Sequence, residues 1–361
     1  MNKKSIYHWI PNSNLGGCEI LLQTFLQGQE NHRHIIFTSK EGPAISLWQE
    51  HDVEIIYLPN WNRHNPMLWA YELKRYLIKF NPGYFISWST SRLPFLRWTL
   101  KDIKNLRYIV HVGNKITISG VRLFEWTFVD FLLGLKKKDS RLMVIGCSKY
   151  VEISIKQDRY FRHFNSIGIL NGVRECFFKE YKRKQHPNNI SLGTVGRLDA
   201  MKRQDEMIMR IKKMTERGYF TMFYIIGNGN EEYNLKKLVS TLKLESNVVF
   251  RGQQFDIIEE LKKIDIFLFN STEHEGMGIA LAEAMSMGLV CIVNDSPLMR
   301  EMLGDIGIFF SDTEDFMKKI ENVLNDQEKM FEISTKVRQR AKKLFAPNVF
   351  FKNYMKYLEL N

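Results

Sequence analysis

The sequence contains few cysteines, and they are far apart. Its four cysteines form no C-x-x-C pair and no metal-ligand spacing. This absence argues against a disulfide framework and indicates reduced, mostly buried thiols in an intracellular protein. The positions are Cys18, Cys147, Cys176 and Cys291.

A long hydrophobic run is also absent. The most apolar stretch, residues 124–135, is interrupted by Glu125 and Asp130, and it falls short of the roughly 20 apolar residues that a membrane span requires. No apolar signal-peptide segment follows Met1. We therefore expect a cytoplasmic protein, and peripheral attachment to the inner face of the plasma membrane stays open.

Positive charge, in contrast, is in excess, with a net charge of +12 at pH 7. Such a charge implies an anionic partner: a nucleotide, a nucleic acid or a membrane surface. The alternative is a basic protein that is merely soluble. Because no recognised nucleic-acid-binding module occurs, we expect no nucleic-acid partner.

The length of 361 residues suits two globular domains. Strand-like runs alternate with helical patterns, which is typical of βαβ units and parallel sheets. The expected strands are residues 5–10, 34–38, 53–58, 84–87, 108–112, 142–147, 167–170, 191–195, 222–226, 248–250, 266–269, 290–293 and 307–310. The expected helices include residues 68–80, 122–135, 204–216, 231–242, 256–263, 278–287, 313–324 and 348–360. The polar stretch 181–189 interrupts this pattern and marks the change of domain. The sequence therefore predicts an α/β fold with two doubly wound parallel sheets.

The clearest candidate site is a strand-to-helix junction in the second half, residues 269–283. Its glycines let the backbone approach a ligand, and the first N–H groups of the helix from about Gly278 can bind a phosphate. Glu275 precedes this helix, and Glu283 lies on the same helix face as Ile279. A diphosphate with a sugar at each end would use both carboxylates. The alternative is a helix with Glu275 at its cap and a solvated Glu283.

Two cations follow another strand of the same half. Arg197 and Lys202 are five residues apart, in a loop that leads into a helix. A guanidinium fork and an ammonium opposite a helix N-terminus would clamp a diphosphate. The alternative is a pair of solvated surface cations.

Two further glycine-rich loops also follow strands. The first, Gly227-Asn228-Gly229, is a G-x-G turn and a weak signal alone. The second, Gly16-Gly17, follows the first strand and leads into a helix, so it offers another phosphate-facing turn. A plain βα loop explains it equally well.

Together these elements resemble the retaining glycosyltransferases of family 4, the glycosyl transferases group 1, which include sucrose synthase and bacterial lipopolysaccharide and mannosyl transferases. The resemblance covers nearly the whole chain and is strongest over residues 193–310. The matching motifs are E-x7-E from Glu275 to Glu283, G-R-L-x-x-x-K from Gly196 to Lys202, N-G-V at residues 171–173 and G-G-x-E at residues 16–19. The resemblance implies the GT-B fold, with two Rossmann-like domains that face one another across a cleft. Its domains would be residues 1–170 for the acceptor, residues 171–345 for the donor, and a last helix, residues 346–361, that crosses back to the first domain.

The resemblance also implies residue roles. Arg197 and Lys202 would neutralise the donor diphosphate, Glu283 would bind the ribose, and Glu275 would bind the transferred sugar. His111, at the end of a first-domain strand, would face the reacting sugar, although a histidine at a strand end is more often structural. The implied donor contacts are completed by Gly16, Gly17, Gly196, Arg251, Gly252, Met277, Gly278 and Ile279, with Arg251 and Gly252 near the base.

The implied reaction is transfer of a hexose or N-acetylhexosamine, with retention, from a nucleoside diphosphate sugar to a hydroxyl of a saccharide acceptor. A UDP-sugar is favoured as donor, with GDP-mannose next, and the acceptor would be lipid-linked, in bacterial surface polysaccharide, lipopolysaccharide or glycan assembly. The chain contains no D-x-D pair, so we expect neither a metal nor a cofactor. Four departures leave the donor sugar open: Met277 replaces a common Phe, Arg203 a Gly, Val290 a Pro and Cys18 an Ala.

Basic and aromatic residues are mixed in two segments of the first half, residues 93–108 and 122–141. The second contains Trp126, Phe128 and Phe131 and ends in a run of three lysines, residues 136–138. Such a surface suits anionic lipid. The alternative is an ordinary amphipathic core helix with a solvated cationic end.

Two rival functions stay open. A sugar-nucleotide epimerase of the same fold would convert the donor sugar without an acceptor. A catalytically inactive paralogue would bind a nucleotide sugar or a partner only, although the joint presence of Arg197, Lys202, Glu275 and Glu283 argues against it.

Overall fold

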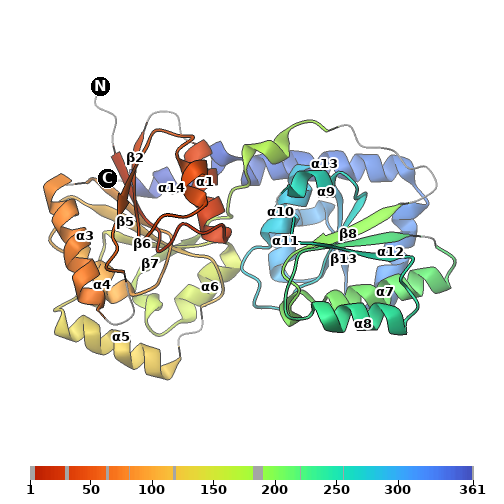
Figure 1. Cartoon of the computed structure of the whole chain (residues 1–361), viewed down its shortest axis with the longest axis horizontal. Coiled ribbons are helices and arrows are strands. Elements are labelled where there is room, and N and C mark those ends of the chain that lie inside the picture. The colour runs from red at the N-terminus through yellow and green to blue at the C-terminus, as the bar shows by residue number, and fades with distance from the viewer. Residues whose placement is uncertain are drawn as a thin grey trace. The chain divides into compact units, whose positions relative to one another are not determined.

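The computed structural model describes residues 5–28, 32–61, 65–80, 82–116, 119–181, 190–219, 221–254 and 256–359. The chain divides into two compact units (Figure 1). The first unit is Met1–Arg174 with Ala346–Asn361, and the second is Glu175–Phe345. The change of unit thus falls after residue 174 rather than after residue 170. Most of the interrupting stretch, residues 182–189, lies outside the described residues.

The first unit contains a parallel sheet of seven strands in the order β3-β2-β1-β4-β5-β6-β7. Its strands are β1 Ser5–Trp9, β2 Arg33–Thr38, β3 Val53–Tyr57, β4 Tyr84–Ser87, β5 Arg107–Val112, β6 Leu142–Gly146 and β7 Asn165–Gly168. Its helices are α1 Gly17–Gln27, α2 Ala44–Trp48, α3 Pro66–Phe80, α4 Leu93–Leu100, α5 Gly120–Leu132, α6 Lys149–Gln157 and α14 Pro347–Leu358, with a 3-10 turn, η1, at Phe161–His163. The order of strands reverses beside β1, which is the doubly wound arrangement.

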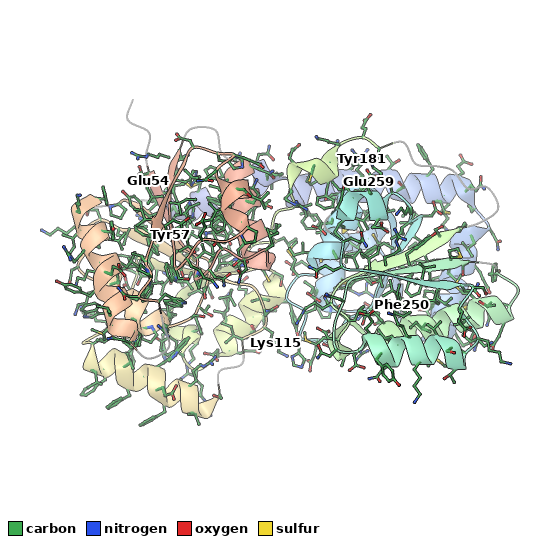
Figure 2. The ribbon with its side chains drawn as sticks, in the orientation of Figure 1. Glu54, Tyr57, Lys115, Tyr181, Phe250 and Glu259 are labelled. Carbon is green, nitrogen blue, oxygen red and sulfur yellow. The ribbon has the colours of Figure 1, made fainter. Side chains whose placement is uncertain are left out.

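The last helix, α14, completes the core of the first unit. Its Phe350 and Tyr354 are fully buried and pack in one cluster with Phe25 of α1 and with Trp88. The approach of α1 to α14 is so close that a Cβ on Gly28 would lie 2.0 Å from the carbonyl oxygen of Pro347. Figure 2 shows side chains filling the space between the sheet and the helices of this unit. All seven tryptophans of the chain also belong to the first unit.

The second unit contains a parallel sheet of six strands in the order β10-β9-β8-β11-β12-β13. Its strands are β8 Ser191–Val195, β9 Met222–Ile226, β10 Val248–Gly252, β11 Ile266–Phe269, β12 Val290–Asn294 and β13 Ile308–Phe310. Its helices are α7 Gln204–Glu216, α8 Glu232–Thr241, α9 Ile257–Leu261, α10 Ile279–Ser286, α11 Pro297–Leu303, α12 Thr313–Leu324 and α13 Gln327–Phe345, with 3-10 turns η2 Glu175–Phe178, η3 Ala200–Lys202 and η4 Gly304–Ile306. The prediction of two doubly wound parallel sheets is confirmed.

The strand prediction was wrong at β7, which begins at Asn165 and ends at Gly168, two residues before the predicted range. Asn165 pairs with Met143, so a polar residue occupies a strand position at the edge of the sheet. A hydrophobic pattern cannot detect such a start. The strand ends at Gly168, where a Cβ would lie 2.6 Å from the backbone of Lys149.

Helix α5 begins two residues before the predicted range, and its first turn is capped by the hydroxyl of Ser119, which accepts the N–H of Arg122. It ends before Gly134, whose φ of +60° is left-handed and stops the helix.

Candidate functional site

Two strand-to-helix loops meet at the carboxyl ends of β8 and β11 in the second unit. These strands are neighbours in the sheet. The backbone N–H of Thr272, in the loop after β11, donates to the carbonyl of Met201, in the loop after β8, at 2.9 Å. Ligands of doubly wound sheets bind outside the carboxyl ends of the strands. The two candidate segments around Lys202 and Glu275 therefore form one continuous surface.

Glu275 joins the two loops through its carboxylate. Its Oε2 forms an ion pair with the ammonium of Lys202, and its Oε1 accepts the backbone N–H of Gly278 at 3.0 Å. The side chains of Lys202 and Glu275 are only 18% and 14% exposed, so this is a partly desolvated pair. The ammonium also lies 5.2 Å from the centre of the Phe269 ring. One carboxylate thus contacts two of the three positive groups that the sequence predicted for a phosphate, Lys202 and the residue before α10, but not Arg197.

Gly278 shapes the start of α10. It is the N-cap residue with a left-handed φ of +67°, and no side chain caps the helix. A Cβ at this position would lie 2.8 Å from Cζ of Phe269. Only glycine fits both conditions. The helix therefore begins at Ile279, directly after the N–H of Gly278 that Glu275 accepts, and its first N–H groups have no partner within the helix.

The neighbours of Gly278 differ in burial. Met277 is buried, whereas Ile279 and Glu283 are half-buried. Glu283 is therefore partly accessible on α10, and the Met277 side chain belongs to the core.

The loop after β11 is fixed by amides that the sequence analysis did not identify. Asn270, which is buried, donates from Nδ2 to the carboxylate of Glu206 at 2.9 Å. Asn294, at the end of β12, accepts the N–H of Ser271 at 3.2 Å and donates to its carbonyl at 3.3 Å. These residues form no motif, because each is defined by a partner that is distant in the sequence.

Arg197 does not share the contact between Lys202 and Glu275. Its side chain is 75% exposed and lies 3.2 Å from the carboxylate of Asp199. Its carbonyl accepts a hydrogen bond from Nε2 of Gln204 at 2.8 Å. The structure therefore fixes the backbone of Arg197 and leaves its guanidinium at the surface.

The weak G-x-G signal has a structural explanation. A Cβ on Gly227 would lie 2.0 Å from the carbonyl oxygen of Gly196, and one on Gly229 would lie 2.2 Å from that of Leu198. The N–H of Leu198 donates to the carbonyl of Asn228 at 2.8 Å. The G-x-G turn is thus the surface on which the G-R-L loop rests.

Arg251 and Gly252 lie at the end of β10, beside the G-x-G turn that follows β9. The guanidinium binds both carboxylate oxygens of Glu260, at 2.9 and 3.0 Å, and it lowers the pKa of that carboxyl. Gly252 has a left-handed φ of +65°, and its carbonyl accepts the N–H of Gly227 at 2.8 Å. The donor fork of Arg251 is therefore engaged within the protein.

In the first unit, the carboxylate of Glu19 lies at the glycine-rich loop formed by Gly16 and Gly17. Gly16 is the N-cap of α1, and the carboxylate of the buried Glu19 lies beside it, since a Cβ on Gly16 would be 2.7 Å from Oε2 of Glu19. Burial raises the pKa of this carboxyl. Glu19 reaches back as in a capping box, so it occupies the helix start that a phosphate would otherwise use. Gly17 is the first residue of the helix.

His111 lies at the end of β5 and is buried. Its Nδ1 is 2.7 Å from the hydroxyl of Tyr354 on α14, and its ring lies beside that of Trp88. Burial lowers its pKa to about 3, so the imidazole is neutral at physiological pH. The histidine is therefore bonded to the helix that closes the first unit.

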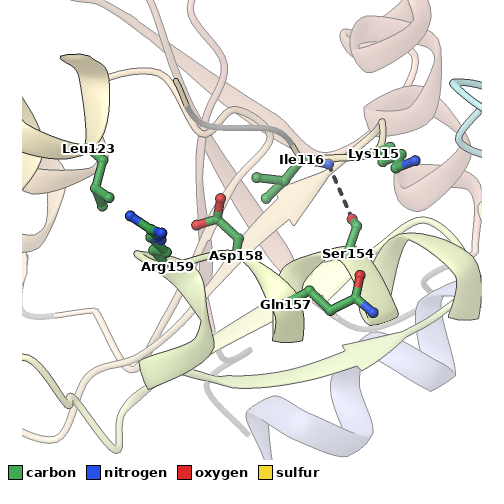
Figure 3. A pocket seen from close by; sticks show the side chains of 7 residues that line it. All are labelled: Lys115, Ile116, Leu123, Ser154, Gln157, Asp158 and Arg159. Carbon is green, nitrogen blue, oxygen red and sulfur yellow. Dashed lines mark hydrogen bonds between the residues drawn. The ribbon is translucent and has the colours of Figure 1, made fainter. Parts of the chain in front are cut away.

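A cavity of about 250 Å³ in the first unit carries no motif. It is bounded by the loop after β5, the start of α5 and the end of α6 (Figure 3). Lys115 and Arg159 bring two cations to it, and the Ser154 hydroxyl accepts the N–H of Ile116 at 3.1 Å. Its remaining lining residues are Leu123, Gln157 and Asp158.

Metal-ligand clusters and membrane-spanning helices are both absent from the described residues. No cluster of three or more histidine, cysteine or carboxylate side chains there could hold a metal ion. In the same part of the chain, no helix is both long enough and apolar enough to cross a bilayer.

Residues 177–344 match the family model described as Glycosyl transferases group 1. An uncharacterized glycosyltransferase of Methanocaldococcus jannaschii is 27% identical over 277 residues, which cover 68% of this chain and 65% of that protein. The O-antigen biosynthesis glycosyltransferase WclY of Escherichia coli is 28% identical over 177 residues, 45% of this chain and 47% of that protein. The chain thus aligns with less than two thirds of the length of either relative.

The crystal structure of Anabaena HepE in complex with UDP and glucose superposes with a TM-score of 0.76 at 16% identity, and covers 98% of this chain and 99% of that chain. At this identity the likeness establishes the fold. The predicted GT-B fold class, with two Rossmann-like parallel-sheet domains, is confirmed.

Proposed function

Because the chain belongs to the group 1 glycosyl transferases, whose model matches residues 177–344, we propose that it transfers a hexose or N-acetylhexosamine from a nucleoside diphosphate sugar to a hydroxyl of a saccharide. The observation that carries this proposal is the convergence of Lys202, Glu275 and the start of α10 at adjacent strand ends. A UDP-sugar is the favoured donor, with GDP-mannose next. HepE, of the same fold, was crystallised with UDP.

Donor binding would exchange one anion for another. The diphosphate takes the first N–H groups of α10, together with the ammonium of Lys202 and the N–H of Gly278, both of which the carboxylate of Glu275 holds in this structure. Glu275 then turns to the hydroxyls of the transferred sugar. The uncapped start of α10 suits this exchange, since N–H groups at a helix start bind phosphate.

In the proposed reaction, the bond between the sugar C1 and the β-phosphate oxygen breaks. The acceptor oxygen bonds to C1 on the same face, so the anomeric configuration is retained, and its proton passes to the departing phosphate. Negative charge grows on the diphosphate, and fixed positive groups stabilise it most effectively. Lys202, Arg197 and the start of α10 supply that charge without a metal ion.

Arg197 would reach the diphosphate by a side-chain rotation. Its exposed ion pair with Asp199 is worth little, on the order of 0–1 kcal/mol, so it does not oppose this movement. Glu283 would bind the ribose. Arg251 and Gly252 would lie near the base, with the Arg251 guanidinium held by Glu260.

The acceptor side is assigned to the first unit. The neutral imidazole of His111 would face the reacting sugar, and Gly16 and Gly17 would approach the donor phosphates from the loop after β1. The acceptor itself would be a lipid-linked saccharide of surface polysaccharide assembly. The relative WclY, named for O-antigen biosynthesis, supports this class of acceptor.

The test combines binding with transfer. UDP-, GDP- and ADP-sugars are compared by thermal shift, since a ligand of the native state raises the melting temperature. The best donor is then assayed with saccharide acceptors. Lys202→Ala and Arg197→Ala should each lower turnover by several orders of magnitude, whereas Lys237→Ala, on the exposed side of α8, should not.

Near-normal transfer by both Lys202→Ala and Arg197→Ala would contradict the diphosphate assignment. NMR of the sugar nucleotide without an acceptor separates the rival function, because an epimerase would convert the donor sugar alone.

A further inference from the structure

Helix α5 presents a second apolar side, away from the core of its unit. At 3.6 residues per turn, its large exposed side chains fall on one stripe about 100° wide. These side chains are Val121, Phe124, Phe128, Phe131 and Leu132, with exposed fractions of 72%, 71%, 50%, 78% and 63%. The rings of Phe124 and Phe128 stack with centroids 6.1 Å apart. A helix with apolar residues on its outer side is typical of an interface.

The inner side of α5 is already satisfied. Asp130 forms an ion pair at 2.5 Å with Arg97, which is buried in the unit, and accepts the hydroxyl of Tyr160 at 3.0 Å. The Trp126 ring packs edge-on against Tyr160, with centroids 5.0 Å apart. These contacts attach the inner side of α5 to the unit. Because the outer stripe is not part of the core, packing within the unit does not explain its apolar side chains.

Cations surround both ends of α5. After the helix, Lys136, Lys137 and Lys138 are exposed, and the ammonium of Lys101 donates to the carbonyl of Leu133 at 3.2 Å. At its start, the cavity of Figure 3 adds Lys115 and Arg159.

Fewer acidic side chains lie near α5, although Asp158 lines the same cavity as Lys115 and Arg159. On the helix itself, Asp130 is bound to Arg97, and Glu125 is exposed. The apolar stripe is thus bordered mainly by positive charge.

We propose that α5 docks the first unit on an anionic lipid surface, with its aromatic stripe in the headgroup region and its lysines on the lipid phosphates. The helix has 13 residues, so its length of about 20 Å suits lying in the interface and is too short to span a bilayer. A protein partner fits less well, because lysine is depleted at protein interfaces. The proposal deepens the assignment of a lipid-linked acceptor, but it rests on α5 alone.

The first test removes the apolar stripe. The full chain is mixed with vesicles of phosphatidylglycerol and phosphatidylcholine, or of phosphatidylcholine alone, and flotation is measured. The wild type should float with the anionic vesicles at low salt. Phe124→Gln, Phe128→Gln and Phe131→Gln combined should reduce the partition coefficient at least about tenfold. Phe331→Gln, which removes a 75% exposed phenylalanine of the second unit, should leave flotation unchanged.

The second test removes the lysines. Lys136→Ala, Lys137→Ala and Lys138→Ala combined should lower binding to anionic vesicles about tenfold or more, and should not affect neutral vesicles. Lys342→Ala with Lys343→Ala, an exposed pair on α13, is the control. Added salt should weaken the wild type toward the lysine variant.

Each outcome has a definite meaning. Absence of wild-type flotation with anionic vesicles, or equal flotation of the phenylalanine variant, would overturn the proposal. A wild-type dimer that the phenylalanine variant dissociates, without flotation, would assign the stripe to a second copy. The thermal shift by UDP-sugars is measured in every variant. A shift that persists when flotation is lost separates lipid docking from the proposed transferase function.

Discussion

The carboxylate of Glu275 forms an ion pair with Lys202 and, through its other oxygen, accepts the N–H that opens α10. It therefore occupies the place that we assign to a diphosphate. A ligand must displace this internal anion, and part of its binding free energy is used to break the ion pair.

Neutralising Glu275 should therefore strengthen the binding of free nucleotide. We expect Glu275→Gln to bind UDP about tenfold more tightly, because loss of a partly buried ion pair corresponds to about 1–2 kcal/mol. Sugar transfer should fall, because the carboxylate is also assigned to the sugar. Isothermal titration with UDP measures the first effect, and a transfer assay the second.

Glu273→Gln is the control, because it removes an exposed charge two residues away in the same loop. Unchanged UDP affinity in Glu275→Gln would disprove the displacement. A weaker affinity of Lys202→Ala for UDP would still support the diphosphate site at Lys202. The displacement of Glu275 and the diphosphate site are therefore tested independently.

Gly278 should tolerate no side chain. Gly278→Ala places a Cβ at a left-handed φ and within 2.8 Å of Phe269. We therefore expect the free energy of unfolding to fall by roughly 2–4 kcal/mol, and the affinity for UDP to fall as well. Gly252→Ala shares the left-handed φ, but its Cβ would meet nothing within 4 Å, so it should cost about 1–2 kcal/mol. Thermal melting of both variants measures the difference. Equal losses would show that the contact with Phe269 is unimportant.

The variant Arg203→Gly should be more stable than the variant Arg203→Ala. Arg203 has a left-handed φ of +45° and caps α7 without a side-chain hydrogen bond. Arg203→Gly and Arg203→Ala both lose its 3.6 Å contact with Glu206, so their difference isolates the backbone. We expect the glycine variant to be about 1 kcal/mol more stable in denaturant melts. A more stable alanine variant would contradict the prediction and would instead follow the ordinary helix propensities of the two residues.

The first unit should be sensitive to acid. Burial lowers the pKa of His34 and of His111 to about 3 each, and that of His8 well below its usual value. In the unfolded chain these groups titrate near 6.5. Their contribution to stability is therefore complete above pH 6.5 and is lost as the pH falls toward 3. Each histidine contributes about 1.4 kcal/mol per pH unit in that window.

Urea melts followed by tryptophan fluorescence measure this effect, because every tryptophan belongs to the first unit. The midpoint should fall strongly between pH 7 and pH 5. His34→Leu should reduce the pH dependence by about a third, and His163→Gln, an exposed histidine, should not change it. A midpoint that is equal at both pH values would refute the prediction.

The fold was largely predictable because buried parallel strands are short apolar runs. Tyr84–Ser87 and Ser191–Val195 have the predicted bounds. The edge strand β7 was misplaced, since its first residues are polar. Residue chemistry placed Arg197 and Lys202 opposite a helix N-terminus, and the resemblance then supplied the G-R-L and E-x7-E motifs and the roles of their residues.

The details of the site were less predictable, since they depend on contacts between loops. The sequence placed Arg197 and Lys202 together, but only Lys202 meets Glu275, because the exposed side chain of Arg197 lies beside Asp199 instead. The partnership of Glu19 with the start of α1 was also missed, although its spacing from Gly16 is that of a capping box. The amide of Asn270 leaves no local signature.

The membership of α14 in the first unit has a consequence for synthesis on the ribosome. Residues 1–174 emerge first, yet the cluster around Phe25 and Trp88 lacks Phe350 and Tyr354 until the last residues are made. At about 5–20 residues per second, the nascent first unit waits roughly 10–40 seconds while the second unit is translated. During that interval the apolar side chains that α14 covers in the folded protein stay exposed to solvent. Addition of the final helix then buries a surface that could otherwise aggregate.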